Sequence, residues 1–388
     1  MPRKNKYLFA RKKRSQYIKE IIITAISACA AFLVILFVYF NLFGTASKVK
    51  LKDNLKAEIN SEAKVSDFID SIEDGKLKED VRVDTTKLGK KNYQLILVIN
   101  GKERNFDFDI EVVDTKAPEI QIDENINVLL GAKSKLEEMA QVSDNSGKVE
   151  VKLKGDYDSD KAGSYSVALI ASDNSGNKAE KTVNINVIDL AKTEGNVSFI
   201  TGKGFKGERI DGVTKINGLI IVNKTFSLPP SYGIGGIHQD AYTALEQLIA
   251  EASDKGVHFN IISGYRSYAT ENNLYNSYVA ARGKEAADTL SAKAGHSENQ
   301  TGYAVDLNST SESFADTKEG KWLAENCAKH GYIIRYPKGK ESFTGYNFEP
   351  WHIRYVGADL AKTLYNDGNW ITLEEYFGIT SAYSDTGR

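Results

Sequence analysis

The feature that most constrains the fold of this chain is an apolar, uncharged run from Ile21 to Phe43 that follows a basic N-terminus. A helix rises 1.5 Å per residue, so this run is long enough to cross the roughly 30 Å hydrocarbon core of a bilayer. The first 19 residues carry eight lysines and arginines and no acid. Because such basic segments stay in the cytoplasm, we predict a cytoplasmic segment over 1–20, a transmembrane helix over 21–43 and the rest of the chain outside the cell.

A cleaved signal peptide is the alternative interpretation of this N-terminal region. The apolar run exceeds an ordinary signal-peptide core, however, and no convincing A-x-A cleavage site follows it. Cys29 ends a segment that faintly resembles a lipoprotein cleavage box, but the run continues well beyond it. A retained span is therefore the favoured interpretation, with Cys29 as a small apolar residue of the helix.

Length and composition set further limits. The chain has 388 residues, enough for two or three domains, and its formal net charge of -2 gives no reason to expect nucleic acid as a partner. Cys29 and Cys327 are the only cysteines, so with Cys29 in the membrane no disulfide can form outside the cell. Cys327 lies in a helical pattern and is expected to be a buried structural thiol. A cysteine-poor exported protein fits a bacterium that does not rely on disulfides.

Two segments behind the apolar run repeat each other at an offset of about 75 residues. Each contains a turn ending in glycine, an apolar run that begins with tyrosine, and a closing strand that ends in aspartate at Asp114 or Asp189. A fixed offset of this size indicates tandem modules. Alternating runs such as 106–110 and 183–187 put apolar side chains on one face, which predicts β-strands.

These modules, 50–114 and 115–190, are predicted to be all-β sandwiches and resemble bacterial surface immunoglobulin-like domains. In such domains a strand ending in V-x-D leads into a T-x-A-P joint, which here is Asp114 to Pro118. The resemblance implies a spacer or an adhesive stalk. Aspartates at this joint could bind Ca²⁺, but oxygen donors at turns are more commonly turn formers.

Residues 191–215 form a polar linker rich in glycine and lysine, and from 216 to 380 the composition changes again. Apolar residues recur with a helical period over 240–255, and helices are also predicted over 272–282 and 321–330. Strands are predicted over 259–262, 332–336 and 352–356. The third domain is therefore expected to be of the α+β class.

This domain offers the side chains that a catalytic zinc site requires. Such a site has three protein ligands, an open position for water and a nearby carboxylate that takes the proton. His352 stands three residues after Glu349, and Asp306 ends a strand pattern in which Gly302 and Ala304 leave room. Pro350 argues against a helix here, so a turn would aim Glu349 at the water while His352 holds the metal. Each residue taken alone is more often structural.

Arg266 lies in the segment S-G-Y-R-S behind a predicted strand. Gly264 permits a sharp turn there, and the guanidinium could fork onto a carboxylate or an oxyanion. The alternative is an ordinary surface arginine.

Four motifs together resemble the VanY-type D-alanyl-D-alanine carboxypeptidases over about residues 215–375. The motifs are S-G-Y-R-S, G-H-S-E-x-Q-T-G-x-A-x-D, R-Y-P-x-G-K and E-P-W-H-x-R-Y-V-G, in this order. The family belongs to the zinc peptidases that also include lysostaphin-like enzymes and the hedgehog fold. The resemblance implies that Zn²⁺ is the cofactor and that the terminal D-alanine of peptidoglycan stem peptides is removed.

Residue by residue, the resemblance makes Asp306 and His352 zinc ligands, Glu349 the catalytic base and Arg266 the group that stabilises the substrate or its oxyanion. The substrate contacts that it implies are Ser297, Glu271, Tyr265 and Trp351.

Two positions depart from the family pattern. The first zinc-ligand histidine is expected seven residues before Asp306, where this chain has Asn299. His296 matches the histidine of the preceding G-H-S and is a possible substitute ligand. Glu271 stands where the family usually has glutamine. Because an amide oxygen is a poor zinc ligand, the chain is either an enzyme with an unusual site, a pseudoenzyme that binds stem peptides without cleavage, or a scaffold.

The sequence thus predicts a multidomain, single-pass membrane protein of a Gram-positive-type bacterium. Its lipid contact is the span 21–43, and two sandwich modules carry a carboxypeptidase-like domain towards the cell wall. The central question for its function is what Asn299 does.

Overall fold

The computed structural model describes residues 49–383 except 74 and 100, together with the isolated positions 19, 24, 26, 27 and 32. The predicted transmembrane helix over 21–43 therefore lies almost wholly outside the described residues and stays a prediction. Among the described residues, no helix has both the length and the apolar character needed to cross a membrane. The chain divides into two compact units, residues 1–118 with 143–149 and 172–177, and the remainder.

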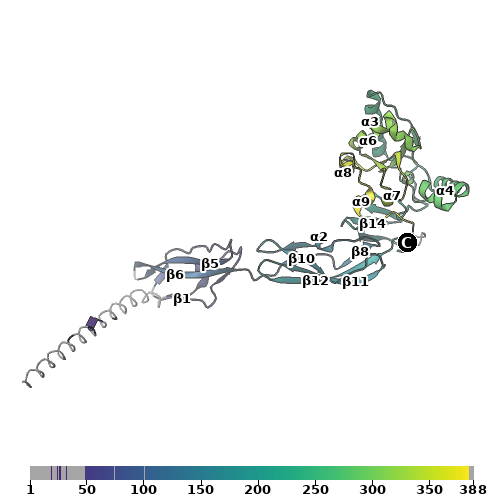
Figure 1. Ribbon diagram of the computed structural model, residues 1–388. Coiled ribbons are helices and arrows are strands. Elements are labelled where there is room, and N and C mark those ends of the chain that lie inside the picture. The colour runs from purple at the N-terminus through teal and green to yellow at the C-terminus, as the bar shows by residue number, and fades with distance from the viewer. Residues whose placement is uncertain are drawn as a thin grey trace, which may run out of the picture. The chain divides into compact units, whose positions relative to one another are not determined.

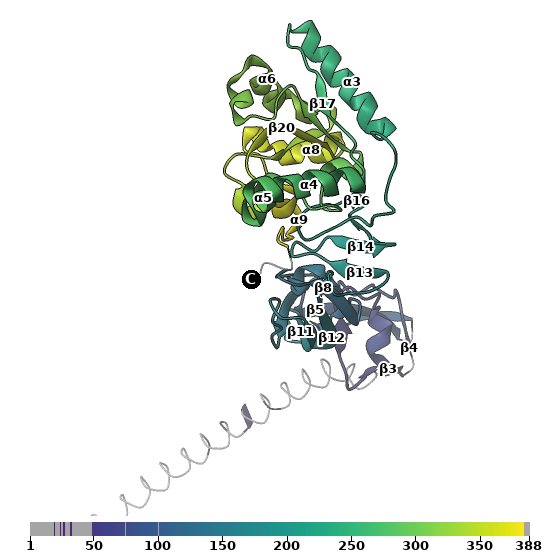
Figure 2. The same ribbon diagram turned by 90° about the vertical axis from the view of Figure 1, so that its right-hand side faces the viewer.

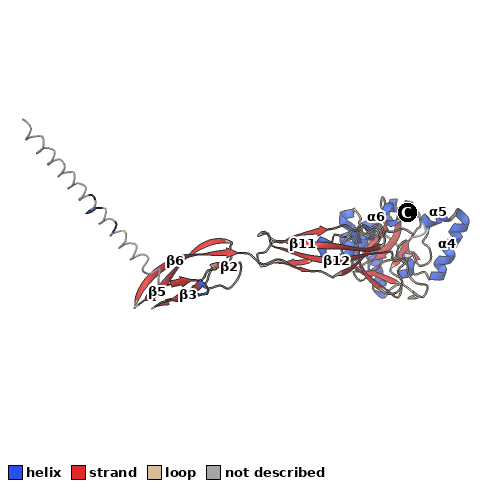
Figure 3. Cartoon of the chain, turned by 90° about the horizontal axis from the view of Figure 1, so that it is seen from below, coloured by secondary structure: helices blue, strands red, loops and turns tan. Residues whose placement is uncertain are grey.

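The first unit is built mostly of strands (Figures 1 and 3). Its strands are β1 (Val49–Leu51), β2 (Lys56–Glu58), β3 (Ile69–Ile72), β4 (Gly75–Leu77), β5 (Gly89–Ile99) and β6 (Lys102–Val113). A four-stranded sheet has the order β2-β6-β5-β4, and β1 pairs with β3. The long β5–β6 hairpin is antiparallel along its whole length, whereas β2 runs parallel to β6.

The alternating run over 106–110 does form a strand, as predicted. Phe108 and Ile110 in β6 are buried, while Asp107 and Asp109 between and beside them are exposed. The buried side chains pack with Leu95 of β5 in one hydrophobic core. Because successive side chains of a strand point to opposite faces, the apolar residues at every second position all pack into the core on one face of the sheet.

The second unit begins with the repeat of this arrangement. Its strands are β7 (Glu119–Gln121), β8 (Asn125–Leu129), β9 (Gln141–Ser143), β10 (Glu150–Lys154), β11 (Gly163–Ser172) and β12 (Lys178–Ile188), with a short helix α2 (Leu136–Met139). The β11–β12 hairpin corresponds to β5–β6, and β8 runs parallel to β12 as β2 does to β6. The predicted tandem β-modules are therefore present as strands, while an immunoglobulin-like topology stays a prediction.

The stretch 191–215, expected as a polar linker, contains strands over about half of its length. It contains β13 (Val197–Ile200), β14 (Lys206–Ile210) and most of β15 (Val213–Ile216), and β16 (Leu219–Ile220) follows. These strands extend the sheet of the second module in the order β10-β11-β12-β8-β13-β14-β15-β16. Phe199 and Ile216 are buried in it. These strands were not predicted because the stretch is polar on average and only a few of its alternating positions are apolar.

The C-terminal part of the second unit mixes helices with a four-stranded antiparallel sheet. The sheet order is β17 (Ile261–Ser263), β18 (Ala304–Leu307), β20 (Glu349–Tyr355), β19 (Tyr332–Tyr336). The helices are α3 (Gln239–Asp254), α4 (Tyr268–Arg282), α5 (Lys284–Leu290), α6 (Lys318–Asn326), α7 (Glu341–Thr344), α8 (Ala358–Tyr365) and α9 (Leu373–Phe377). Figure 2 shows α3, α6 and α8 around the sheet.

The helices and strands predicted for this domain are found within a few residues of their expected bounds. In α3, Ala241, Leu245, Leu248 and Ala252 are buried at the spacing of one helix face. Cys327 is a buried free thiol, and its burial was predicted. Burial raises the pKa of its thiol, so it is inert as a nucleophile.

Candidate active site

Asp306 and His352 face each other across two neighbouring strands. They are register partners in the antiparallel pair β18–β20, so their side chains lie on the same face of the sheet. The Nδ1 atom of His352 lies 2.7 Å from Oδ1 of Asp306, and both side chains are buried. Burial opposes both charges, but their mutual attraction outweighs it. The pKa of Asp306 is therefore below, and that of His352 above, its ordinary value.

Glu349 opens β20 and lies beside this pair. Its Oε2 is 3.9 Å from Nδ1 of His352, and the side chain remains 19 % exposed. Burial and the neighbouring Asp306 carboxylate raise the pKa of Glu349 to about 7, although His352 opposes this shift. A carboxylate that is poised near neutral pH and partly open to solvent can take a proton from water and return it. The structure thus brings together the three residues 306, 349 and 352.

Asn299 is buried, and both polar atoms of its side chain are hydrogen-bonded. It belongs to the short 3-10 helix η3 (Glu298–Thr301). Its Nδ2 donates to the carbonyl of Gly264 at 3.0 Å, and its Oδ1 accepts a hydrogen bond from the Arg266 guanidinium. The backbone N–H of Arg266 also donates to the Asn299 carbonyl. The residue at the expected ligand position therefore ties two segments together.

The turn that carries Asn299 requires glycine at its end. Gly302 has φ 75°, in the left-handed region. A Cβ atom built there would lie 2.2 Å from the Ile234 side chain and 2.7 Å from the Gly236 carbonyl oxygen. Both the backbone conformation and the lack of space therefore exclude a larger residue.

Glu271 and Ser297 complete the surroundings of Arg266. Oε1 of Glu271 lies 2.8 Å from Nε of Arg266 and accepts a hydrogen bond from the Ser297 hydroxyl at 2.7 Å. Glu271 is only 1 % exposed, and burial raises its pKa even though Arg266 opposes that effect. The carboxylate of Glu271, which stands where a glutamine was expected, therefore pairs mainly with Arg266.

His296 does not join the pair Asp306–His352. Its Nδ1 lies 2.8 Å from the carbonyl oxygen of Asn223, and its ring packs edge-on against Tyr383. In the described part of the chain, only Asp114, Asp144 and Asp173 bring three histidine, cysteine or carboxylate ligand atoms within 4.8 Å of one another. His296 is thus not placed as a third ligand in this conformation.

The two remaining predicted contacts differ in access. Tyr265 is half-buried and directly precedes Arg266 in the chain. Trp351 lies in β20 and is only 9 % exposed. Its position indicates a role in packing the sheet.

Sequence reasoning missed a buried ion-pair network behind the site. Glu298 accepts from Nε of Arg335 at 2.8 Å and from the Arg354 guanidinium. Glu374 in turn accepts from both terminal nitrogens of Arg335, at 2.9 and 2.7 Å. All four side chains are buried. The network anchors η3, which carries Asn299, to β19 and β20.

Tyr336 was also missed. Its ring centroid lies 5.1 Å from that of His352, and it pairs in register with Glu349. The R-Y-P motif contained the residue, but nothing in the sequence placed it against the histidine. Its contact restricts the rotation of the imidazole.

The donor atoms fit a zinc ion only in part. A carboxylate oxygen and an imidazole nitrogen are ordinary zinc ligands, and both belong to the close pair Asp306–His352. The third family position offers an amide that is already bound to Arg266 and Gly264. The residues present therefore supply two of the three protein ligands that a catalytic zinc site ordinarily has.

Comparison with known proteins identifies this part of the chain. The family model of the VanY D-alanyl-D-alanine carboxypeptidases, which are zinc-dependent, matches residues 235–358. The Bacillus subtilis (strain 168) protein YodJ is 37 % identical over 198 residues, which cover 44 % of this chain and 72 % of YodJ. The D-alanyl-D-alanine carboxypeptidase of Enterococcus faecalis (strain ATCC 700802 / V583) is 34 % identical over 175 residues, 41 % of this chain and 65 % of the relative.

Among solved structures, a variant of the vancomycin-resistance D,D-pentapeptidase VanY in complex with Zn(II) is 35 % identical, with a TM-score of 0.36 over 40 % of this chain and 97 % of that one. The sequence matches and the order of the motifs agree on the same region. Through its C-terminal domain, the chain belongs to the VanY D-alanyl-D-alanine carboxypeptidase family.

Proposed function

We propose that the C-terminal domain binds peptidoglycan stem peptides that end in D-alanine and removes the terminal residue as a carboxypeptidase. The observation that carries the proposal is the 2.7 Å contact of Asp306 with His352, with Glu349 3.9 Å from the same imidazole nitrogen. Family membership supports the substrate class, since the Enterococcus faecalis relative is a D-alanyl-D-alanine carboxypeptidase.

In this proposal each side chain has one task. Glu349, with its pKa near 7, takes the proton of the attacking water and passes it to the leaving amine. Arg266 pairs with the peptide carboxylate or with the oxyanion that develops on the scissile carbonyl. Asp306 and His352 would hold the metal, and a bound zinc ion would supply Lewis acidity to the carbonyl and the water.

The metal is proposed to be bound weakly. The Asn299 amide is a poor zinc ligand, and it is already hydrogen-bonded to Arg266 and Gly264. Loss of one imidazole ligand should lower zinc affinity on the order of 10³-fold or more, scaled up from the 10- to 100-fold cost of losing an outer partner. Activity should then depend on added zinc.

A second candidate function is binding of stem peptides without cleavage. The hydrogen-bonded amide of Asn299 favours it, since a site that holds no metal at cellular zinc levels still keeps Arg266 in place. In that case Arg266 would anchor the peptide carboxylate, and Glu349 would have no reaction to serve.

One experiment separates the two functions. A synthetic stem pentapeptide ending in D-Ala-D-Ala is incubated with the full chain, with EDTA or with added ZnCl₂, and released D-alanine is measured alongside peptide binding by calorimetry. Release only with zinc supports the carboxypeptidase. Binding that is equal in EDTA, without release at any zinc level, supports the second function. Neither binding nor release would overturn both.

We also propose that the protein is anchored in the membrane with this domain facing the wall. The support is the basic segment 1–20 followed by the apolar run 21–43. Protease added to intact cells should remove the C-terminal domain if the topology is right, and should spare it if the topology is reversed.

A further inference from the structure

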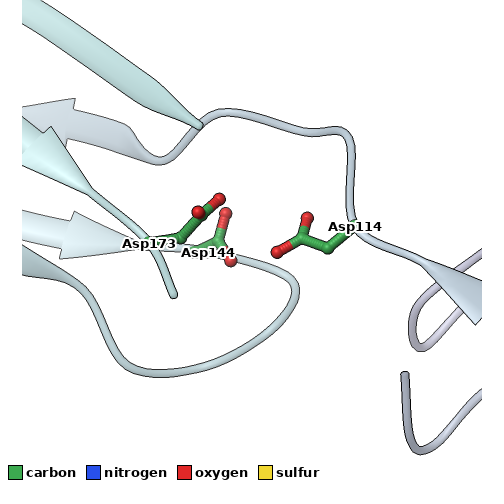
Figure 4. Close-up of side chains that lie close together, drawn as sticks. All are labelled: Asp114, Asp144 and Asp173. Atoms are coloured by element: carbon green, nitrogen blue, oxygen red, sulfur yellow. The ribbon is translucent and has the colours of Figure 1, made fainter. Parts of the chain in front are cut away.

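Three aspartates from distant parts of the sequence converge in the first unit. Asp114 directly follows β6, Asp144 lies in the loop between β9 and β10, and Asp173 lies in the turn between β11 and β12. One carboxylate oxygen of each lies within 4.8 Å of those of the other two. Figure 4 shows the carboxylate of Asp114 directed towards those of Asp144 and Asp173.

The carboxylate of Asp114 has no compensating partner. Asp114 is only 8 % exposed, and within the described residues neither of its carboxylate oxygens accepts a hydrogen bond. Oδ2 of Asp144 is likewise buried and unpaired. Within the described part of the chain, no lysine, arginine or histidine forms an ion pair with any of the three aspartates. Buried carboxylates in this state are costly unless something positive binds to them.

Turn formation does not account for this convergence. Oδ1 of Asp144 accepts from the backbone N–H of Ser146 at 2.8 Å, which is an ordinary turn contact, but Oδ2 is left over. Oδ1 of Asp173 accepts from the backbone of Ser175 and Asn177. Asp114 accepts no such bond on its side chain. The turns thus orient the carboxylates of Asp144 and Asp173. The carboxylate of Asp114, towards which they lie, takes no part in either turn.

Neighbouring side chains hold this arrangement in place. The Asn177 amide donates both to Oδ2 of Asp173, at 2.8 Å, and to the backbone carbonyl of Asp114, at 3.1 Å. The Asn145 amide donates to Glu58 at 2.8 Å, while its own Oδ1 is buried and unpaired. The aspartates are therefore positioned by their surroundings before any ligand arrives.

We propose that Asp114, Asp144 and Asp173 form a structural Ca²⁺ site. All three donors are oxygens, which suits Ca²⁺, whereas the absence of nitrogen and sulfur donors disfavours Zn²⁺. Ca²⁺ also tolerates irregular coordination with water, and Mg²⁺ demands near-ideal octahedral geometry. The site is independent of the proposed peptidase activity, because none of its residues belongs to the C-terminal domain. A dissociation constant on the order of 10⁻⁴ to 10⁻³ M, as in extracellular calcium modules, is expected.

Calorimetric titration of the full, EDTA-treated chain with CaCl₂ tests the site directly. The expected result is one Ca²⁺ per chain, with a rise in the melting temperature of the first unit that MgCl₂ does not reproduce at equal concentration. The absence of binding and of any melting shift up to about ten times the expected dissociation constant would overturn the proposal.

Two variants and a control assign the ion to these residues. Asp144→Asn keeps Oδ1 for the Ser146 turn and removes one charge, and Asp114→Asn removes the unpaired carboxylate without a turn bond to lose. Each should weaken Ca²⁺ binding by about tenfold or more, because the affinity of oxygen-ligand sites depends on the number of charged ligands. Asp109→Asn on the exposed face of β6 should bind as the native chain does. Unchanged affinity in both Asp114→Asn and Asp144→Asn would contradict the assignment.

Discussion

The two acidic groups of this protein differ in how their charge is balanced. Asp306 in the C-terminal domain has His352 at 2.7 Å, so its charge is compensated within the protein. Asp114 in the first unit is equally buried, but it has no hydrogen-bond partner for its carboxylate among the described residues. The carboxylates of the first unit therefore depend on an external cation, whereas the pair Asp306–His352 can persist when a metal is weakly bound. This explains how the fold of the C-terminal domain can accommodate Asn299 at a ligand position.

The largest effect should come from removing the imidazole that compensates the charge of Asp306. His352→Ala removes one of two zinc donors and leaves the Asp306 carboxylate without its partner. Zinc binding and D-alanine release should both fall below detection, while Ca²⁺ binding at Asp114, Asp144 and Asp173 stays unchanged. Zinc is measured by competition with a chelator. His258→Ala, at an exposed position, is the control, and full zinc binding by His352→Ala would refute the ligand assignment.

Glu349→Gln separates catalysis from metal binding. The glutamine keeps the shape of the side chain but cannot accept the proton of water, so the turnover rate should fall about 10²- to 10⁴-fold. Zinc affinity should stay within about threefold, because Glu349 is the proposed base and not a ligand. Release of D-alanine is followed beside that of Glu341→Gln, an exposed control. Retained turnover would exclude Glu349 as the base.

Glu298→Gln tests whether the C-terminal domain depends on the buried ion-pair network of Glu298 with Arg335 and Arg354. Removing one charge from a buried pair leaves Arg335 and Arg354 incompletely compensated, so the free energy of unfolding should fall by about 3–5 kcal/mol. Urea denaturation measures it, with exposed Glu312→Gln as the control. A loss below about 1 kcal/mol would show that the network does not hold the fold.

The same residue gives this network a pH dependence. Although burial opposes its charge, the two arginines hold the pKa of Glu298 below its ordinary value of 4.5. Its stabilising contribution is therefore complete above pH 4.5 and is lost as the pH falls through the lower folded-state value. Stability of the native chain should drop with acidification below pH 4.5 more steeply than that of Glu298→Gln.

The smallest effect is expected at Glu271. Glu271→Gln removes the negative charge 2.8 Å from Arg266, so the guanidinium should attract a peptide carboxylate more strongly. Because the Arg266 side chain is 26 % exposed and solvent screens its charge interactions, the change is worth about 1 kcal/mol, or about fivefold in KM. Steady-state kinetics, or peptide binding if there is no turnover, measures it against exposed Glu285→Gln. Weaker binding would mean that Glu271 orients Arg266 more than it neutralises it.

Local patterns predicted the elements of this molecule well. The helical period over 240–255 appears as α3, and alternation over 106–110 appears as the buried face of β6. Both patterns are direct consequences of side-chain geometry within one element. The strands of 191–215 were missed because only a few positions, such as Phe199, are buried there.

Contacts between distant segments were predicted less well. Motif order gave Asp306, Glu349 and His352, and the register of β18 with β20 brings two of them together. No pattern in the sequence indicated that Arg266 would bind Asn299, or that Glu298 would bind two arginines. Aspartates at the module joint were interpreted mainly as turn formers, with Ca²⁺ binding as the less common alternative. No pattern indicated that Asp114 would meet Asp144 and Asp173, because that convergence depends on strands far apart in the chain.

Zinc affinity of Asn299→His, compared with the native chain by chelator competition, tests the central claim most directly. The account holds that position 299 alone limits a site whose other members are in place. It predicts that the histidine raises zinc affinity on the order of 10³-fold and raises D-alanine release at low zinc. Zinc affinity within about threefold of the native value would contradict it.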